Sequence, residues 1–242
     1  MVSKQGGVLH WIPLIVVPLA IMTFFLLGGV RVQVEPKGIW QADFLYNNYL
    51  AAEKELLKTS ITGKKIGLET AQELAVLGGN LPGIIPDCGN LNGVMFWNKA
   101  DKFCFPDIKA NVESLGKAKL NTATEKTFSK IGYDKTLFYS VGGKETITTK
   151  YAQYTYDNSF SVDIGYNFDE YGQLFQEATV LVNQCRGKDI PCISAAKPAL
   201  WKFESCKKEV IHSSGTTFSF CVESRFTSNG EKLNYKFALD FS

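Results

Sequence analysis

The stretch FSFCVESRFTSNGEKLNYKFALDF, residues 218–241, decides how the carboxyl-terminal part of the chain folds. Asn229-Gly230 is a strong signal for a two-residue hairpin turn, because both residues tolerate the positive φ angles of a type I′ turn. Apolar residues alternate with polar ones on either side of that turn. The predicted hairpin therefore brings five pairs onto one face: Phe226 with Leu233, Ser224 with Tyr235, Val222 with Phe237, Phe220 with Leu239 and Phe218 with Phe241.

A second alternating segment covers residues 145–166. A three-residue loop at 157–159 would make it another antiparallel hairpin with its apolar residues on one face. Tyr151, Tyr154 and Tyr156 in this segment form either an aromatic strip that binds glycan or peptide, or part of the core, which is the commoner role. The expected cross-strand pairs are Tyr156 with Phe160, Tyr154 with Val162 and Ala152 with Ile164.

Helical periodicity marks the part of the chain before these strands. An apolar stripe predicts a helix from residue 38 onwards, and its members are Ile39, Tyr46, Leu50, Leu57 and Ile61. A second helix is expected over residues 68–77, ended by Gly78-Gly79. Residues 80–106 are typical of a loop. Asp107 begins a further predicted helix, and Thr122, with Glu125 three residues later, begins another.

The clearest helix of the soluble part ends at Cys185. Asn167 or Asp169 caps its beginning, and apolar residues recur along it at spacings of three and four. Gly187 closes it, and Asp189-Ile190-Pro191 is typical of the start of another short helix.

The segment VLHWIPLIVVPLAIMTFFLLGGV, residues 8–30, contains no acidic or basic side chain apart from His10. At about 1.5 Å per residue a helix of this length spans roughly 34 Å, which is enough to cross the apolar core of a bilayer. We expect a transmembrane helix that is kept as an anchor. Two alternatives remain open: a cleaved secretory signal, whose apolar region is usually shorter, and a pilin-type leader that is cut after Gly6.

Charge does not orient this segment, because Lys4 lies on one side of it and Arg31 and Lys37 on the other. The cysteines are more informative. All six lie beyond residue 87, and an even number on one side of a membrane fits an oxidising exterior. We therefore place residues 31–242 outside the cell; the alternative is a cytosolic domain with buried, reduced thiols.

The cysteine spacings predict three local disulfides: Cys88 with Cys104, Cys185 with Cys192 and Cys206 with Cys221. The second pair would join the end of one predicted helix to the start of the next. A hairpin that turns at residues 212–215 would place the two cysteines of the third pair opposite each other on adjacent strands. Each bond would stabilise the fold by about 2–4 kcal/mol.

Composition excludes several classes of function. With 26 basic and 24 acidic residues the net charge is +2, which argues against a nucleic-acid partner held by bulk charge. The chain has only two histidines and no CxxC motif, so a zinc site is not expected. Residues 141–144 lack the residues of a phosphate loop and are more typical of a turn. We assign no catalytic residue, no metal ligand and no cofactor.

Two carboxylate pairs are the candidate catalytic groups of a glycosidase: Asp169 with Glu170, and Asp157 with Asp163. Such a pair of carboxylates is what a glycosidase requires. Helix capping and solvation of a hairpin are the commoner roles of these residue types. An enzyme that processes envelope glycan or peptide would need them to converge in a cleft.

Several segments taken in order carry a resemblance to a known group. They are the apolar amino-terminal segment, YNNYLAAEKELL (46–57), ELAVLGG (73–79), Cys88-Gly89, SFSVDIGYNFDEY (159–171), LVNQC (181–185), FCVES (220–224) and YKFALDF (235–241). The chain resembles uncharacterised archaeal single-pass surface proteins. The resemblance implies an extracytoplasmic setting, and it transfers no functional residue because the group has no established activity.

The sequence therefore predicts an α+β protein in four parts: a short tail (1–7), a transmembrane helix (8–30), a helical stalk (31–79) and a disulfide-stapled head with antiparallel strands (80–242). Its expected function is that of a membrane-anchored structural or interaction protein of the cell surface. The bilayer would be one partner, through residues 8–30, and surface proteins or glycans the others. The alternatives are a type IV pilin-like filament subunit and an envelope enzyme.

Overall fold

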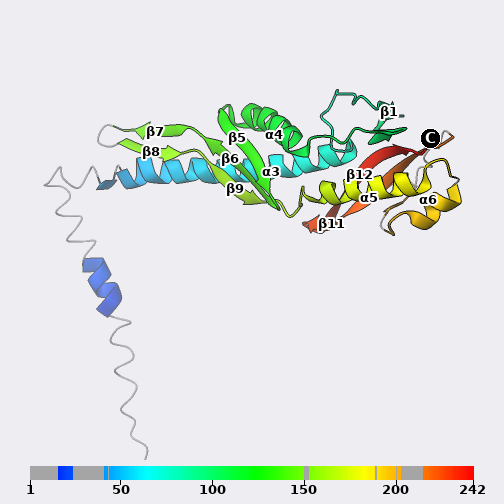
Figure 1. The fold of residues 1–242 in the computed structure, drawn as a ribbon. Coiled ribbons are helices and arrows are strands. Elements are labelled where there is room, and N and C mark those ends of the chain that lie inside the picture. The colour runs from blue at the N-terminus through cyan, green and yellow to red at the C-terminus, as the bar shows by residue number, and fades with distance from the viewer. Residues whose placement is uncertain are drawn as a thin grey trace, which may run out of the picture. The chain divides into compact units, whose positions relative to one another are not determined.

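The structure, a computed structural model, describes residues 16–23, 41–42, 44–149, 153–188, 190–199, 201–202 and 215–242. Figure 1 shows a mixture of helices and strands, and six ladders of described strands are antiparallel. The predicted α+β class with antiparallel strands is therefore confirmed. The chain divides into two compact units, Met1–Lys54 with Glu145–Tyr156, and Glu55–Lys144 with Asp157–Ser242.

The first unit contains a π-helical turn, η2 (Phe44–Tyr49), next to strand β8 (Gln153–Asp157). The ring of Tyr154 packs edge-on against the rings of Phe44 and Tyr49, with 5.9 Å between centroids in each pair. Strand β7 (Lys144–Thr148) pairs with β8, and the Tyr156 hydroxyl donates a 2.9 Å hydrogen bond to Glu145 Oε2. Aromatic packing and cross-strand bonds thus define this unit.

Helix α3 (Leu50–Val76) is one continuous helix of 27 residues, so the prediction of two helices here was wrong. Most of it belongs to the second unit, which includes residues that the sequence assigned to a stalk. The predicted apolar stripe lies on the exposed side: Leu57 and Ile61 are 62% and 63% exposed. The helix is buried instead through Ile66 and Leu74 on another face.

Two glycines allow α3 to approach its sheet closely. A Cβ atom added at Gly63 would overlap the ring of Phe160, and one at Gly67 would lie 3.0 Å from the ring of Phe138. Both glycines lie within the helix despite their low helix propensity. Side chains of the strands pack into the space that a larger residue would occupy at these two positions. The helix ends as predicted at Gly78-Gly79, both with positive φ, where the Gly79 N–H donates to the Leu74 carbonyl.

Helix α4 (Ile108–Thr124) begins at Asp107, whose side chain accepts a 3.0 Å hydrogen bond from the Ala110 N–H. The predicted cap at Asp107 is confirmed. No new helix starts at Thr122, because α4 runs through that residue. Glu125, expected to complete a capping box, is instead the left-handed residue at the end of α4 (φ 56°).

The hairpin predicted for residues 152–164 is wrong. Strand β9 (Phe160–Asp163) pairs with β6 (Leu137–Gly142), and β8 pairs with β7. β6 also pairs with β5 (Phe128–Asp134), and neither of these two strands was predicted from the sequence. Residues 142–143 form no turn but join β6 to β7. The backbone of Asn158 lies so close to Gly142 that a Cβ there would overlap it, which explains the glycine.

The carboxyl-terminal hairpin joins β11 (Thr217–Ser228) to β12 (Glu231–Asp240) through Asn229-Gly230, as predicted. Both turn residues have positive φ, 52° and 81°. The predicted register holds only beside the turn. A bulge between Glu223 and Thr227 shifts it by two residues, so that Val222 lies opposite Tyr235 and Phe220 opposite Phe237. A shift of two keeps every side chain on its face, so nine of the ten predicted residues are buried and Phe226 is partly buried.

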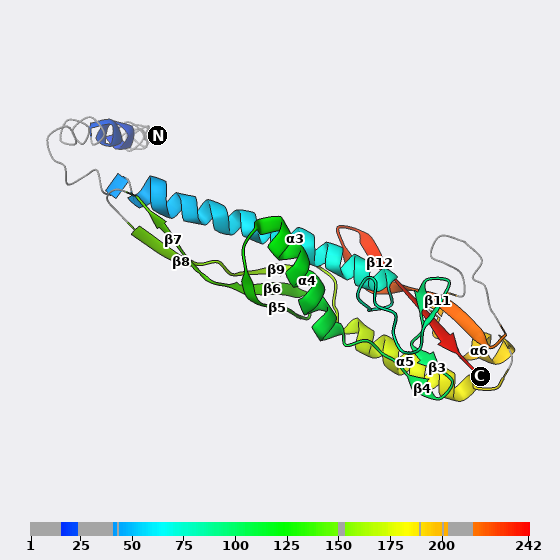
Figure 2. The ribbon, with the colours of Figure 1, turned by 90° about the horizontal axis from the view of Figure 1, so that it is seen from above.

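Helix α5 (Glu170–Cys185) and the short α6 (Ile190–Ala196) follow the predicted boundaries closely. Figure 2 shows α5 lying alongside the β11–β12 hairpin. Strand β10 (Trp201–Lys202) pairs with β11 in antiparallel fashion, but Lys202 is the residue opposite Cys221. The prediction had placed Cys206 there, and Cys206 lies outside the described residues.

Residues 80–106, predicted as loop, also contain two minimal hairpins: β1 (Asn90–Leu91) with β2 (Val94–Met95), and β3 (Asn98–Lys99) with β4 (Lys102–Phe103). Between them Trp97 is fully buried in the core of the second unit. Its ring stacks on Phe237 with 3.6 Å between centroids, and its indole N–H donates to the Gly78 carbonyl. Trp97 thus joins this irregular segment to the residues that follow α3 and to strand β12.

Residues 16–23 are helical and their large apolar side chains are 51–63% exposed. Within the part of the chain that the structure describes, no helix has the length and apolar character needed to cross a membrane. The remainder of the expected segment 8–30, and Gly6, lie outside the described residues.

Candidate functional site

Two neighbouring acidic residues at the beginning of α5, Asp169 and Glu170, differ in their exposure to solvent. Glu170 is only 2% exposed, whereas Asp169 is exposed. Glu170 accepts three hydrogen bonds: from Ser224 Oγ (2.6 Å), the Arg225 N–H (2.7 Å) and the Tyr235 hydroxyl (2.8 Å). These donors belong to β11 and β12, so the carboxylate joins helix to hairpin.

The donors around Glu170 lie at the β-bulge. Ser224 and Arg225 fall between Glu223 and Thr227, where the register shifts. A bulge leaves backbone groups without partners in the ladder. The Glu170 carboxylate satisfies one of them, the Arg225 N–H. Glu170 therefore has a structural role in this arrangement.

Two buried tyrosines adjoin this carboxylate. Burial, together with the nearby Tyr171 and the charge of Glu170, raises the pKa of Tyr235 far above its usual range. Burial and the charge of Glu170 likewise raise the pKa of Tyr171. The two rings meet edge-on at 4.9 Å, yet the Tyr171 hydroxyl has no hydrogen-bond partner among the described residues.

A shallow groove of about 340 Å³ lies where α4 and α5 begin. Its aromatic lining includes Tyr133 at the end of β5, Phe168 before α5 and Phe175 one turn into it. Asp107 and Asp169, the N-cap residues of the two helices, line the same groove. We define these five residues as the aromatic–acidic groove.

The groove combines apolar rings with negative charge. The rings of Tyr133 and Phe168 lie 4.8 Å apart at a tilt of 40°. Burial raises the pKa of Tyr133, and the charges of Asp169 and Asp107 raise it further, so both carboxylates act on this ring. Lys109 also lines the groove and is exposed, leaving two negative charges against one positive.

Two other hollows of the second unit have different linings. One of about 260 Å³ is lined by residues 55–62 of α3 and by residues 123–126, and contains Glu55, Lys58 and Lys126. Another of about 510 Å³ is lined by Glu69, Glu73 and Lys119 together with apolar residues. Lys119 forms ion pairs with both of these glutamates and Lys65 with Glu69, so both carboxylates already have a cationic partner.

The carboxylates expected of an enzyme do not converge. Asp157, Asp163 and Asp169 are exposed, and Asp163 accepts a hydrogen bond from the Gly165 N–H in a tight turn. Glu170 is buried in the bonds described above. The structure thus shows the three aspartates exposed to solvent, and the Asp169 side chain makes no capping hydrogen bond. Among the described residues no group of three or more His, Cys, Asp and Glu side chains could hold a metal ion.

The tyrosine strip is not a free surface. Tyr156 is 8% exposed and Tyr154 is half-buried by its ring contacts with Phe44 and Tyr49. Tyr151 lies outside the described residues. The two described members of the strip therefore serve packing, which is the commoner role considered from the sequence.

Two of the predicted disulfides are present, Cys88–Cys104 and Cys185–Cys192. Cys221 is also disulfide-bonded, while Cys206, its expected partner, lies outside the described residues. The second bond joins the last residue of α5 to α6, as expected from the spacing. None of the described cysteines is a free thiol.

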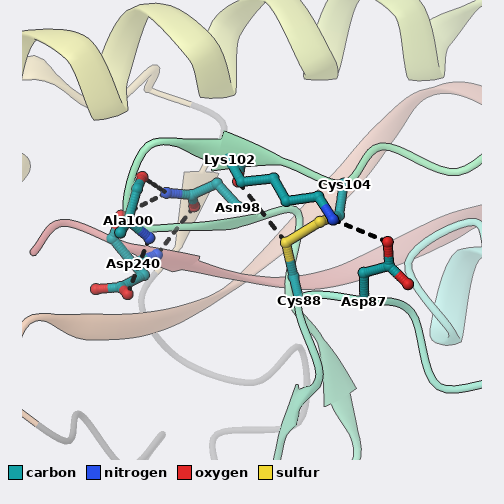
Figure 3. Close-up of a disulfide and its surroundings, with 7 residues drawn as sticks. All are labelled: Asp87, Cys88, Asn98, Ala100, Lys102, Cys104 and Asp240. Carbon is teal, nitrogen blue, oxygen red and sulfur yellow. Dashed lines mark hydrogen bonds and ion pairs between the residues drawn. A yellow bond between two sulfur atoms is a disulfide. The ribbon is translucent and has the colours of Figure 1, made fainter.

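The Cys88–Cys104 bond holds a loop that polar contacts also fasten (Figure 3). Asn98 is fully buried; its amide donates to the Asp240 carbonyl (2.5 Å), and its side-chain oxygen accepts from the Asp240 N–H (3.0 Å). The Asp240 carboxylate accepts in turn from the Ala100 N–H (3.2 Å). The loop is therefore joined to the last residue of β12.

The aromatic–acidic groove was missed from the sequence. Asp107 and Asp169 were each recognised as helix caps, but nothing in their local patterns shows that two helices begin side by side. Tyr133 belongs to β5, one of the strands that were not predicted. The available signal was an aromatic residue next to a predicted N-cap, as with Phe168 beside Asp169.

Comparison with known proteins places the chain in no group. No family model matches it, and neither the curated proteins nor the solved structures contain a significant match.

Proposed function

We propose that the chain is a single-pass membrane protein whose α+β part lies outside the cytoplasm and binds other molecules of the cell surface. The observation that carries the proposal is the set of disulfides: Cys88–Cys104, Cys185–Cys192 and the bond of Cys221. Stable disulfides are typical of oxidising compartments and rare in the cytosol. The uncharged segment at residues 8–30 supports an anchor.

The proposed arrangement keeps the parts inferred from the sequence. Residues 1–7 form a short tail, residues 8–30 the anchor, and the chain from residue 31 onwards is external. The aromatic–acidic groove supports a binding role, because grooves with several aromatic side chains and a few charged groups are a common form of recognition site.

Protease treatment of intact cells tests the proposal. A tag placed after Ser242 is expected to be removed by an added protease in intact cells, while a cytosolic control protein stays whole. If the tag is protected in intact cells and cleaved only after permeabilisation, the external placement is wrong. Mass mapping without reduction should also find no free thiol among the six cysteines; six free thiols would contradict the proposal.

A second candidate is a subunit of a pilin-like filament. The observation that favours it is the pair of exposed apolar side chains one turn apart on α3, Leu57 and Ile61, since a filament would cover them with other copies. Mass spectrometry of the native amino terminus decides between the two. A terminus at Gly7, after cleavage behind Gly6, supports the filament subunit; an uncleaved terminus or removal of the whole apolar segment contradicts it, and an uncleaved terminus supports the anchored surface protein.

A further inference from the structure

We infer that the aromatic–acidic groove binds the guanidinium group of an arginine side chain presented by a partner protein. The inference rests on the proposed function, since it names the chemical class that the external part recognises. The groove brings together Asp107 and Asp169 beside the rings of Tyr133, Phe168 and Phe175.

The size of the groove suits one side chain. Its volume of about 340 Å³ is at the lower end of the range for small-molecule sites, about 300–1,000 Å³. It is open rather than enclosed, so a side chain can enter from an extended partner segment. Tyr133 and Phe175 are only partly buried, which leaves ring surface for contact.

Charge complementarity selects a cation. Helix N-termini usually attract anions, but both helix starts here carry an aspartate of their own. Asp107 satisfies the Ala110 N–H, and Asp169 makes no capping hydrogen bond with its side chain. An anion would meet two carboxylates, whereas a cation would meet two charges of opposite sign. Lys109 opposes the cation from the rim.

The aromatic rings favour guanidinium over ammonium. A guanidinium group is planar, stacks on ring faces and offers five donors to carboxylates. An ammonium group is more strongly hydrated and loses more on contact with apolar rings. Carboxylates form paired, charge-assisted hydrogen bonds with guanidinium groups, and both Asp107 and Asp169 line the groove. The groove therefore matches arginine in charge, shape and polarity.

The test uses the full chain in an uncharged detergent and ligand-observed NMR titrations of short peptides. The probe is a pentapeptide with one central arginine between glycines, and the matched ligand carries citrulline, which has the same shape without the charge. We expect the arginine peptide to bind about tenfold more tightly, consistent with the strength of a cation–ring contact assisted by carboxylates.

Variants locate the binding. Asp107→Asn together with Asp169→Asn should lower the affinity for the arginine peptide to that for the citrulline peptide, because both negative charges are removed. The asparagine side chains keep the size of the aspartates, so the fold should be unchanged. Asp157→Asn removes the same charge from an exposed residue that does not line the groove, and should leave the affinity unchanged. Lys109→Ala should raise the affinity about twofold, since an exposed charge pair is worth a few tenths of a kcal/mol.

Three outcomes would overturn the inference. They are equal affinity for the arginine and citrulline peptides, equal loss in Asp157→Asn and in the double variant, and tighter binding of a lysine peptide than of the arginine peptide. Circular dichroism of each variant establishes that it is folded. The protease experiment on intact cells is independent of these titrations, so a failure of the groove and a failure of the external placement are seen separately.

Discussion

Ser224 Oγ donates a 2.6 Å hydrogen bond to Glu170 Oε2, although 54 positions separate the two residues in the chain. Both side chains are buried, and Ser224 lies in the bulge that shifts the register of the β11–β12 hairpin. The first residue of α5 thus lies beside the register shift of the β11–β12 hairpin. Helix position and strand register are coupled through this carboxylate.

Glu170→Gln should destabilise the fold by about 1–3 kcal/mol. The amide keeps the shape of the side chain but replaces an acceptor oxygen with an NH₂ group, which leaves one of the buried donors on Ser224, Arg225 or Tyr235 without a partner. Urea unfolding of the full chain measures the loss. Asp169→Asn, at the exposed neighbouring position, should change the free energy of unfolding by less than about 0.5 kcal/mol. Equal effects of the two substitutions would contradict a special role for Glu170.

Gly63→Ala should destabilise the second unit even though alanine has the higher helix propensity. The added methyl group would overlap the Phe160 ring, and overpacking of this kind costs about 1–3 kcal/mol. Gly172→Ala in α5 is the matched control, because nothing lies within 4 Å of its added Cβ. That variant should be stabilised by up to about 1 kcal/mol. Thermal unfolding compares them, and a stabilised Gly63→Ala would refute the close helix–sheet contact.

Removal of the disulfides should have a graded effect. Cys88→Ser with Cys104→Ser opens a loop of sequence separation 16, and Cys185→Ser with Cys192→Ser one of separation 7. The chain-entropy relation gives losses of about 3 and about 2.5 kcal/mol. Urea unfolding of each double variant measures them. If neither variant loses stability, the bonds do not constrain the unfolded chain as argued.

Tyr171→Phe and Tyr235→Phe should have opposite effects at neutral pH. The Tyr171 hydroxyl is buried without a partner among the described residues, so its removal should be neutral or stabilising by up to about 1–2 kcal/mol. The Tyr235 hydroxyl donates to Glu170, so its removal should cost about 1–3 kcal/mol. A loss of stability in both variants would show that Tyr171 has a partner after all.

Stability should fall at alkaline pH. Burial holds the pKa of Tyr171 and Tyr235 above the unfolded value of about 10. Their contribution is complete below pH about 10 and is lost as pH rises toward the higher pKa values of the folded state, because the unfolded chain then releases protons that the folded chain keeps. Urea unfolding between pH 8 and 11 should show this decline, and Tyr235→Phe should make it shallower. An unchanged slope in that variant would contradict the assignment.

Local patterns were sufficient for several elements. The Asn229-Gly230 turn, the capping role of Asp107, the boundaries of α5 and the pairs Cys88–Cys104 and Cys185–Cys192 all depend on residues close in sequence, where backbone propensity and short loops decide the outcome. The buried face of the last hairpin was also predictable, because a period of two survives a register shift of two.

Tertiary packing decided the rest. Gly63 and Gly67 look like helix breakers until the side chains of the strands packed against them are known. Strand β9 pairs with β6, and its predicted partner β8 pairs with β7. The bulge at Ser224 lies beside Glu170, and Asp107 and Asp169, which precede two different helices, line the same groove. Contacts between distant residues set these features, and such contacts leave no periodic trace in the local sequence.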